Sequence, residues 1–473
     1  MIPDLFEQEV RAIRRTRTPT YSNTGVLEHQ GRGRPLHIAR LLGTVLGTTL
    51  LTTTAVLTAP AQAAPSALPS TSLGRGSLDE AALQESLDAA HEAGLYGVFS
   101  AVRDGRERWT GASGLADVAT GRPVTPGMRQ RVGSISKTFT AVAVLQQAER
   151  GRIRLDAPVA DYLPDLIPGE RGREITVRML LNHTSGIGDH VIPAFPSLLQ
   201  NSPASLDEER FRSIPPEELV RLGLAAPATG RPGEVPGTYS NTNYVIAGLL
   251  LEKVTGQDAD AYVTRHVIDR AGLRHTYLPR TPYLKGPHPR MYEALYGLID
   301  PPRDYSVYDM SWIRSAGAVV STMDDVNRFY RALLGGKLVG EAALGEMMRT
   351  VRVGGMEYGL GIYTVELRGC GRFWGHNGAV FGAGTFALTS QDGKRQVAFA
   401  QNLMKYQILD ENGRPLPHPI DDALSRHVVR ALCPDTGTAA PATRDARGAL
   451  SELLPGIDHS QLTSSLKFDQ VSP

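Results

Sequence analysis

The residues best suited to chemistry are a serine and a lysine three positions apart, in Ser134-Ile135-Ser136-Lys137. Residues three apart share one face of a helix, so the hydroxyl and the amine would meet. Serine is a weak nucleophile until a base takes its proton, and a desolvated lysine can act as that base. Backbone N–H groups at a helix start would stabilise a developing oxyanion. This spacing is suited to a serine nucleophile that a neighbouring lysine activates.

Lysine is scarce in this chain, with 7 lysines among the 50 basic residues, so the position of Lys137 is informative. A second Ser-x-x-Lys occupies residues 464–467, but no apolar helical pattern precedes or follows it. Because short motifs arise by chance, a Ser-x-x-Lys spacing indicates an active site only when other reactive residues elsewhere in the chain support it.

A second candidate is Tyr239, in Tyr239-Ser240-Asn241. A phenol beside an ammonium group loses its proton more readily, so Tyr239 is a candidate general base, and then an acid toward the leaving group. The carboxamide of Asn241 is suited to holding the lysine or the substrate by hydrogen bonds. The same tripeptide occurs at residues 21–23, in a segment expected to be removed.

A third candidate is His376-Asn377-Gly378-Ala379, in a region with strand-like alternation. A glycine on an edge strand lets the backbone approach a substrate closely. The Ala379 N–H would then be a second oxyanion donor. A similar His-x-Gly at residues 29–31 precedes the predicted cleavage point.

The apolar pattern predicts the elements that must position these groups. Helices are expected from Ser77, opened by a Ser77-x-x-Glu80 capping box, and over 133–151, 321–334 and 418–432. A hairpin is expected over 98–116, three antiparallel strands over 358–402, and a mostly helical insertion over 152–300. The predicted fold class is α+β, with both ends of the region in one antiparallel sheet flanked by helices.

Composition excludes several other classes of protein. The chain has 473 residues, 41% of them apolar, which suits a globular core. Its 50 basic and 49 acidic residues give a formal charge of +1, which argues against nucleic-acid binding driven by bulk charge. Two cysteines are too few for a Cys-rich zinc domain. No cofactor or metal site is predicted.

The first 63 residues have the pattern of a secretory signal. A basic stretch at 29–40 precedes an uncharged apolar stretch at 41–59 and a small-x-small site at 61–63. A membrane anchor is the alternative, but threonine and glycine dilute the apolar stretch. We expect a signal region at 1–63, a linker at 64–76, a hydrolase domain at 77–435 and a flexible tail at 436–473. The mature protein is expected to be secreted or associated with the cell wall, with no stable membrane span.

The three motifs occur in order within longer runs, among them VGSISKTFTAVAVLQQAERGRIRLDAPVADYLPD, ITVRMLLNHTSGI, GTYSNTNYVIAGLLLEKVTG, SAGAVVSTMDDVNRF and YGLGIYTVEL…WGHNGAVFG. Over about 76–435 the chain resembles the class C β-lactamase and D-alanyl-D-alanine carboxypeptidase group of serine hydrolases. It closely resembles the secreted actinomycete carboxypeptidases, in which the third motif also begins with histidine.

The resemblance implies a β-lactamase/transpeptidase-like fold with the site between a sheet and a helical domain. The reactive groups that it implies are Ser134 as nucleophile, Lys137 as its base partner and Tyr239 as base and acid, with the N–H groups of Ser134 and Ala379 as oxyanion donors. The residues that it places at the substrate are Asn241, which also anchors the lysine, the aromatic Trp312, and His376 as a positive wall with Asn377 and Gly378. It also implies a disulfide between Cys370 and Cys433. The expected substrate is a small peptide, ester or β-lactam, such as a peptidoglycan stem peptide.

One departure leaves the substrate open. In the carboxypeptidases an arginine after the Tyr-Gly-Leu-Gly segment binds the substrate's free carboxylate, but here the matching residues are Ile362-Tyr363-Thr364-Val365. A bidentate arginine is hard to replace, and nearby Arg372 would need a different approach. A D-alanyl-D-alanine carboxypeptidase-like activity, an esterase, a D-amino-acid peptidase and a β-lactamase all fit the same residues.

Three other interpretations fit the sequence less well. An α/β-hydrolase needs Gly-x-Ser-x-Gly, which no serine here satisfies. A metalloenzyme would start from His183, Asp189 and His190, but there is no His-Glu-x-x-His. A non-catalytic penicillin-binding sensor should lack a reactive group, whereas every expected group is present.

Overall fold

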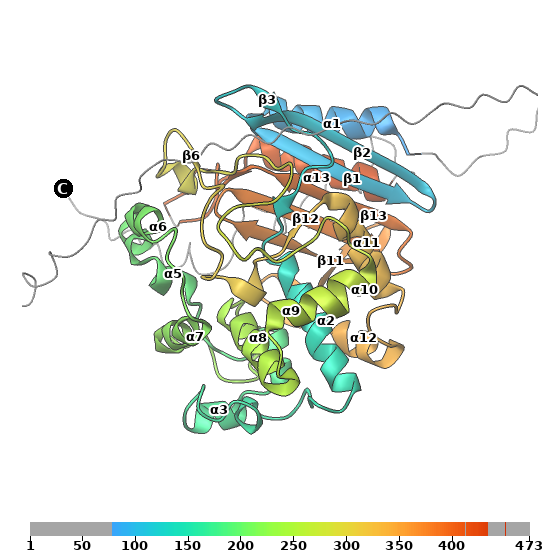
Figure 1. Cartoon of the computed structure of the whole chain (residues 1–473). Coiled ribbons are helices and arrows are strands. Elements are labelled where there is room, and N and C mark those ends of the chain that lie inside the picture. Colours follow the sequence, from blue (N-terminus) through green and yellow to red (C-terminus); the bar gives the residue numbers. More distant parts are fainter. Residues whose placement is uncertain (1–77, 412, 434–449, 451–473) are drawn as a thin grey trace, which may run out of the picture. The chain divides into compact units, whose positions relative to one another are not determined.

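The computed structural model describes residues 78–411, 413–433 and 450 (Figure 1). The predicted signal region and linker, and the tail apart from Leu450, lie outside these residues. The helices are α1 Glu80–Glu92, α2 Ile135–Glu149, α3 Glu170–Glu174, α4 Val177–Leu181, α5 Val191–Ala194, α6 Ala204–Glu208, α7 Pro216–Ala225, α8 Thr242–Thr255, α9 Ala259–Val263, α10 Asp269–Ala271, α11 Met323–Leu334, α12 Glu341–Met347 and α13 Pro419–Leu432. The strands are β1 Gly97–Asp104, β2 Glu107–Asp117, β3 Arg122–Pro123, β4 Gln130–Arg131, β5 Tyr292–Glu293, β6 Arg303–Asp304, β7 Val320–Ser321, β8 Val351–Val353, β9 Met356–Tyr358, β10 Tyr363–Leu367, β11 Gly371–Val380, β12 Ala383–Ser390, β13 Arg395–Gln401 and β14 Leu403–Met404.

One antiparallel sheet of nine strands runs in the order β3-β2-β1-β13-β12-β11-β10-β9-β8. The N-terminal hairpin, β1 and β2, lies against β13, with Val98 opposite Gln401. The prediction that the two ends of this region share one sheet is therefore confirmed. Over 358–402 the structure has four strands, β10 to β13, where three were predicted, because residues 363–367 pair with β11 as a strand of their own.

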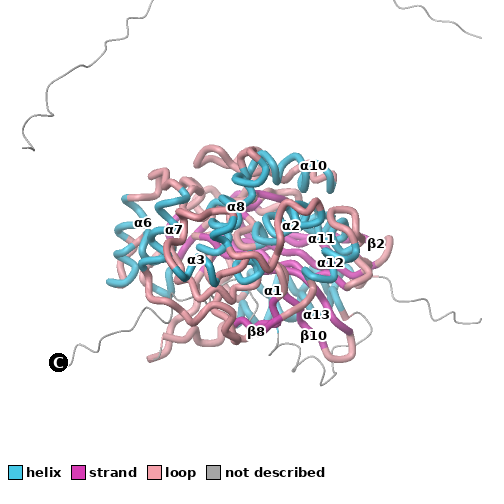
Figure 2. The backbone as a smooth tube through the Cα atoms, turned by 90° about the horizontal axis from the view of Figure 1, so that it is seen from below, coloured by secondary structure: helices cyan, strands magenta, loops and turns pink. Residues whose placement is uncertain are grey.

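Both faces of this sheet are covered by helices (Figure 2). Val98 and Val102 of β1 lie in the apolar cluster that also contains α1 and α13 residues. Phe99, on the opposite face, lies in the larger cluster with α2 and α11. Phe139 of α2 stacks on Phe329 of α11 with ring centroids 3.7 Å apart. This packing on the second face fixes the helix that begins next to Ser134.

Local side chains set where several helices begin. Asp79 caps α1, because its carboxylate accepts a hydrogen bond from Ala82 N at 3.0 Å. The predicted start at Ser77 was therefore two residues early, and Ser77 itself lies outside the described residues. Thr322 caps α11 by accepting from Asp325 N at 3.3 Å, so the helix predicted over 321–334 begins two residues later, at Met323.

The middle of the chain is helical only in part. Helices α3 to α10 occupy 170–271, in agreement with the predicted insertion. Residues 272–322 are instead mostly irregular, with the short strands β5, β6 and β7. Pro and Gly interrupt this stretch repeatedly, which prevents a longer helix. None of the helices within the described ranges is long and apolar enough to cross a bilayer.

The C-terminal helix is attached to the sheet by a covalent link. Cys370 and Cys433 form a disulfide with their Cα atoms 5.4 Å apart, as the resemblance implied. It joins the end of α13 to the turn between β10 and β11. Leu450, inside the segment expected to be a flexible tail, is fully buried in the cluster with α1 and α13. The flexible tail over 436–473 stays a prediction.

His427 connects three elements on the same face of the sheet. Its Nδ1 lies 2.8 Å from Ser86 Oγ of α1, and its Nε2 lies 2.8 Å from Ser100 Oγ of β1. Burial is the largest cause that lowers the pKa of His427, to about 3, and the charge of Arg430 lowers it further. The ring is therefore neutral in the folded protein at any pH well above 3.

We expect His427 to make the stability of the protein depend on pH. Its folded pKa lies below the unfolded value, so its contribution is complete above about pH 6.5 and falls as the pH drops toward 3. The stability gap between wild type and His427→Gln should shrink by about 1.4 kcal/mol per pH unit below 6.5. Urea unfolding at several pH values measures this gap. A gap that stays constant between pH 6.5 and 4.5 would contradict the assignment.

Candidate active site

Ser134 directly precedes α2, just after the short strand β4. Gly133 before it has φ +53°, a conformation that favours glycine. A Cβ at Gly133 would lie 2.6 Å from the backbone nitrogen of Ala379, so a side chain here would push the start of α2 away from β11. Ser134 is partly exposed, whereas residues 135–147 of α2 are buried. Ser134 thus lies where the start of the buried helix meets the solvent.

Lys137 lies one turn into α2 and is 0% exposed. Its Nζ is 2.9 Å from Ser134 Oγ, 2.7 Å from Asn241 Oδ1 and 2.9 Å from Ala316 O. It also lies 4.9 Å from the centroid of the Tyr239 ring. The amine is thus held from two sides by fixed oxygens while it points at the serine. The structure places these two residues together as the Ser-x-x-Lys spacing predicted.

Tyr239 lies shortly before α8 and is partly exposed. Its ring lies among buried aromatic side chains, with centroids 4.1 Å from His183, 5.9 Å from Tyr358 and 6.3 Å from His376. His183 has a positive φ of 60° and a pKa well below its usual value, first because of burial and then because of the Lys137 charge. Tyr239 therefore lies beside Lys137, and its ring packs on the uncharged ring of His183.

Asn241 is anchored by a carboxylate that the sequence interpretation did not include in the site. Asp189 Oδ2 accepts from Asn241 N at 2.7 Å and from Asn241 Nδ2 at 2.8 Å. The two residues are 52 positions apart. The sequence suggests Asp189 only as a metal ligand, and no local pattern links it to Asn241.

His376 is in the site, but with a different charge from the one predicted. Its pKa falls to about 3, mainly through burial and then through the Lys137 charge. Nδ1 lies 2.5 Å from Asn377 O, so it donates to that carbonyl, and Nε2 accepts from the Tyr358 hydroxyl at 2.8 Å. The positive wall implied by the resemblance is therefore a neutral ring, because the surrounding tyrosines exclude water.

The end of β11 lies against the start of α2. Strand β10 pairs only with residues 371–375 of β11, so residues 376–380 extend beyond it. A Cβ at Gly378 would lie 1.9 Å from Val132 O. The close approach that this glycine permits is therefore to the protein's own backbone. Asn377 and Ala379 remain partly exposed at this edge, on either side of the buried Gly378.

Trp312 lies in an aromatic cluster at one side of the site. Its ring centroid is 5.0 Å from Phe381 and 5.6 Å from Phe195. Its carbonyl oxygen is 2.7 Å from His190 Nε2, and His190 directly follows Asp189 in the chain. Trp312 is almost fully buried within this cluster. Its predicted contact with substrate remains a prediction.

The stretch that holds a carboxylate-binding arginine in the carboxypeptidases is apolar here. Ile362 and Tyr363 are fully buried, and Thr364 Oγ1 already donates to Phe373 O at 2.9 Å. Arg372 pairs with Glu366 at 3.2 Å on the surface, where both side chains are 60% exposed. Neither the stretch 362–365 nor Arg372, which is paired with Glu366, therefore offers a cation to a substrate carboxylate.

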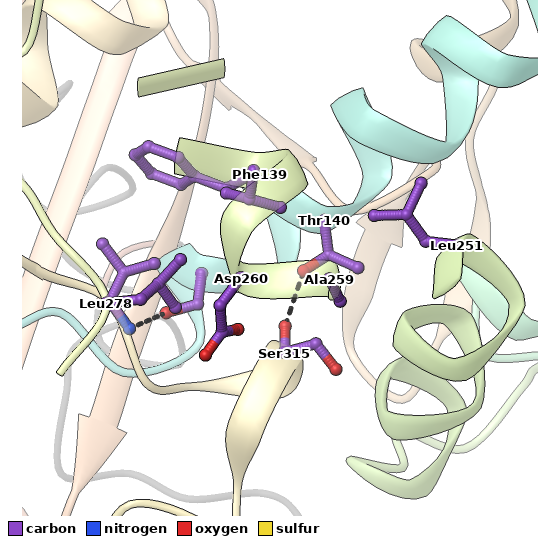
Figure 3. Close-up of a pocket in the computed structure, with 10 residues that line it drawn as sticks. Phe139, Thr140, Leu251, Ala259, Asp260, Leu278 and Ser315 are labelled. Carbon is purple, nitrogen blue, oxygen red and sulfur yellow. Dashed lines mark hydrogen bonds between the residues drawn. The ribbon is translucent and has the colours of Figure 1, made fainter. Parts of the chain in front are cut away.

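A small cavity borders another part of α2 and contains none of the proposed reactive groups (Figure 3). It is lined by Ser136, Phe139, Thr140, Leu251, Ala259, Asp260, Val263, Leu278, Ser315 and Val319. The pKa of Asp260 rises to about 6, first through burial and then through the charge of Asp258. Among the residues that the structure describes, no three His, Cys, Asp or Glu side chains are grouped so that they could hold a metal ion.

Taken together, the fold and the Ser134–Lys137 pair are those of a serine hydrolase. The family described as Beta-lactamase matches residues 80–449. A D-stereospecific amidohydrolase from Streptomyces sp. has a similar structure, with a TM-score of 0.66 and 36% identity over 76% of this chain and 100% of that chain. This chain therefore belongs to the β-lactamase family of serine hydrolases, which confirms the resemblance seen in the sequence.

Two curated relatives carry different activities in their names. Penicillin-binding protein 4 of Amycolatopsis lactamdurans is 31% identical over 64% of this chain and 76% of its own length. Esterase EstB of Burkholderia gladioli is 34% identical over 42% of this chain and 52% of its own length. The first curated relatives are matched over only 63%, 52% and 42% of their lengths. The family therefore leaves the substrate undetermined.

Proposed function

We propose that this chain is a secreted hydrolase that cleaves small amides or esters with a D-configured acyl group through an acyl-enzyme at Ser134. The observation that carries the proposal is the Lys137 amine, 2.9 Å from Ser134 Oγ and held by Asn241 and Ala316. Secretion is supported by the basic, apolar and small-residue pattern over 29–63.

In the proposed acylation, Ser134 Oγ attacks the substrate carbonyl carbon and its proton passes to Lys137 Nζ. Two positions of the Lys137 nitrogen face Asn241 Oδ1 and Ala316 O, so the lone pair of the deprotonated amine would point at the serine. The N–H groups of Ser134 and Ala379 stabilise the oxyanion. Tyr239 passes its phenol proton to the leaving amine or alcohol and then takes a proton from the attacking water, while Lys137 returns its proton to Ser134 Oγ as the acyl group is released.

The substrate class follows from what surrounds this machinery. With no arginine at 362–365 and Arg372 engaged by Glu366, the site lacks the clamp for a free C-terminal carboxylate. A neutral His376 adds no positive charge. An amide or ester without that carboxylate therefore fits better than a D-alanyl-D-alanine stem peptide. The Streptomyces relative, aligned over its whole length, is named for D-stereospecific amide hydrolysis.

The proposal is tested by covalent labelling and by a substrate panel. We expect a fluorophosphonate to label the protein, and D-phenylalanine amide to be hydrolysed at least about 100-fold faster than its L-enantiomer or a D-Ala-D-Ala peptide. Nitrocefin and short-chain esters complete the panel. A preference for D-Ala-D-Ala would restore the carboxypeptidase assignment. Labelling by penicillin with no turnover of any substrate would support a sensor instead.

A further inference from the structure

The orientation of the Asn241 amide decides whether Lys137 is held or repelled. Only the oxygen of a carboxamide can accept a hydrogen bond from an amine N–H, and the NH2 group cannot. The structure places Asn241 Oδ1 2.7 Å from Lys137 Nζ and turns Nδ2 to the opposite side. Some group on that opposite side must favour this orientation over its flipped alternative.

Asp189 provides that group. A carboxylate is purely an acceptor, so it attracts the Asn241 NH2 group and would repel the amide oxygen. Its Oδ2 receives both Asn241 Nδ2–H and the Asn241 backbone N–H, at 2.8 and 2.7 Å. A flipped amide would place two oxygens against each other in a site shielded from water. The amide is therefore fixed before any substrate binds.

The loop that carries Asp189 is itself fixed to the start of α8. Asp189 Oδ1 accepts from Val191 N at 2.8 Å. Gly188 O accepts from Ser240 Oγ at 3.0 Å and from Thr242 Oγ1 at 2.8 Å, on either side of Asn241. Asp189 is only 4% exposed. Its carboxylate cannot leave Asn241 without breaking these contacts.

We propose that Asp189 is a positioning residue for the reaction: through the Asn241 amide, its carboxylate aligns the Lys137 amine with Ser134 and supports the positive charge that the amine gains on acylation. The inference rests on the proposed function. Asp189 exchanges no proton in this scheme, because protons move only among Ser134 Oγ, Lys137 Nζ, the Tyr239 phenol, the leaving group and water. A carboxylate hydrogen-bonded to the amide makes the amide oxygen a stronger acceptor for the charged lysine.

The test is the kinetics of fluorophosphonate labelling in the full chain. Misplacing a catalytic group by about 1 Å costs about 100-fold in rate, so Asp189→Leu should lower kinact by about 100-fold with KI nearly unchanged. Asp189→Asn keeps an oxygen that can accept both Asn241 donors but lacks the charge, so it should lose only about 10-fold. If the Leu variant does not fold, the Asn variant carries the test alone.

A double-mutant cycle separates positioning from general structural damage. If Asp189 acts through Asn241, Asp189→Asn should lower kinact no further in an Asn241→Ala background, whereas independent effects would multiply. Asp421→Asn is the matched control, because Asp421 is also buried and accepts from Tyr406 and Gln407 but lies on α13. It should leave kinact unchanged.

The outcomes distinguish this inference from the proposed function. A wild type that is not labelled at all would overturn both. A labelled wild type with an equally reactive, folded Asp189→Leu would overturn only the role of Asp189. Multiplying effects in the double-mutant cycle would also overturn it, because they would mean that Asp189 does not act through Asn241.

Discussion

Replacing Ser134 by alanine is expected to abolish fluorophosphonate labelling and to lower the hydrolysis of any good substrate by about 10⁴- to 10⁶-fold. The change removes only the hydroxyl oxygen. Lys137 keeps its contacts with Asn241 and Ala316, so the rest of the site should stay in place. The remaining activity would come from the oxyanion donors and from substrate binding. Gel fluorescence after labelling, and mass spectrometry of the acylated peptide, measure the effect.

The chain provides its own matched control for this prediction. Ser464 is the first residue of the second Ser-x-x-Lys, so Ser464→Ala makes the same change in a motif to which no catalytic role is assigned. It should label like wild type. Labelling that persists in a folded Ser134→Ala protein, or that disappears in Ser464→Ala, would contradict the assignment of the nucleophile.

The features that the sequence predicted well depend on neighbouring residues. The Ser134–Lys137 contact follows from helix geometry alone. The hairpin of β1 and β2 follows from alternation interrupted at Asp104-Gly105. The order of the motifs along the chain was enough to indicate the family.

The features that the sequence could not predict depend on packing between distant segments. The resemblance implies a positively charged His376, but Tyr358 and Tyr363 bury its ring and keep it neutral. Asp189 and Asn241 meet only because the loop before α5 folds onto the start of α8. Neither the burial of a side chain nor a contact between distant segments leaves a periodic signal in the sequence. The charge of His376 and the contact of Asp189 with Asn241 could therefore be seen only in the structure.

A buried ion pair stabilises the turn after β11, the strand that carries the proposed oxyanion donor Ala379. Lys405 Nζ lies 3.2 Å from Glu293 Oε2, and both side chains are at most 4% exposed. The same carboxylate accepts from Gly382 N and Leu295 N, each at 3.0 Å. Gly382 lies in the turn that joins β11, with Ala379, to β12. The pair therefore ties this turn to β5.

The second large effect is expected when one member of this pair is removed. Glu293→Leu should lower the free energy of unfolding by about 3–5 kcal/mol, because it leaves Lys405 as an unpaired buried charge. Lys405→Met should cost a similar amount, because it leaves Glu293 unpaired. The double variant Glu293→Leu/Lys405→Met should recover much of this loss, since an apolar pair needs no charge partner. Denaturant unfolding of the four proteins measures each value.

We expect the double variant to regain stability without regaining full activity. Comparing its stability with its activity tests whether the charged pair also serves catalysis. The double variant still lacks the carboxylate that holds Gly382 N, so Ala379 should be less well placed and acylation should remain about 10-fold slower than in wild type. The exposed pair Arg372–Glu366 is the matched control, and its removal should change stability by less than about 1 kcal/mol. A Glu293→Leu protein as stable as wild type would contradict the buried pairing. A fully active double variant would show that the pair serves stability alone.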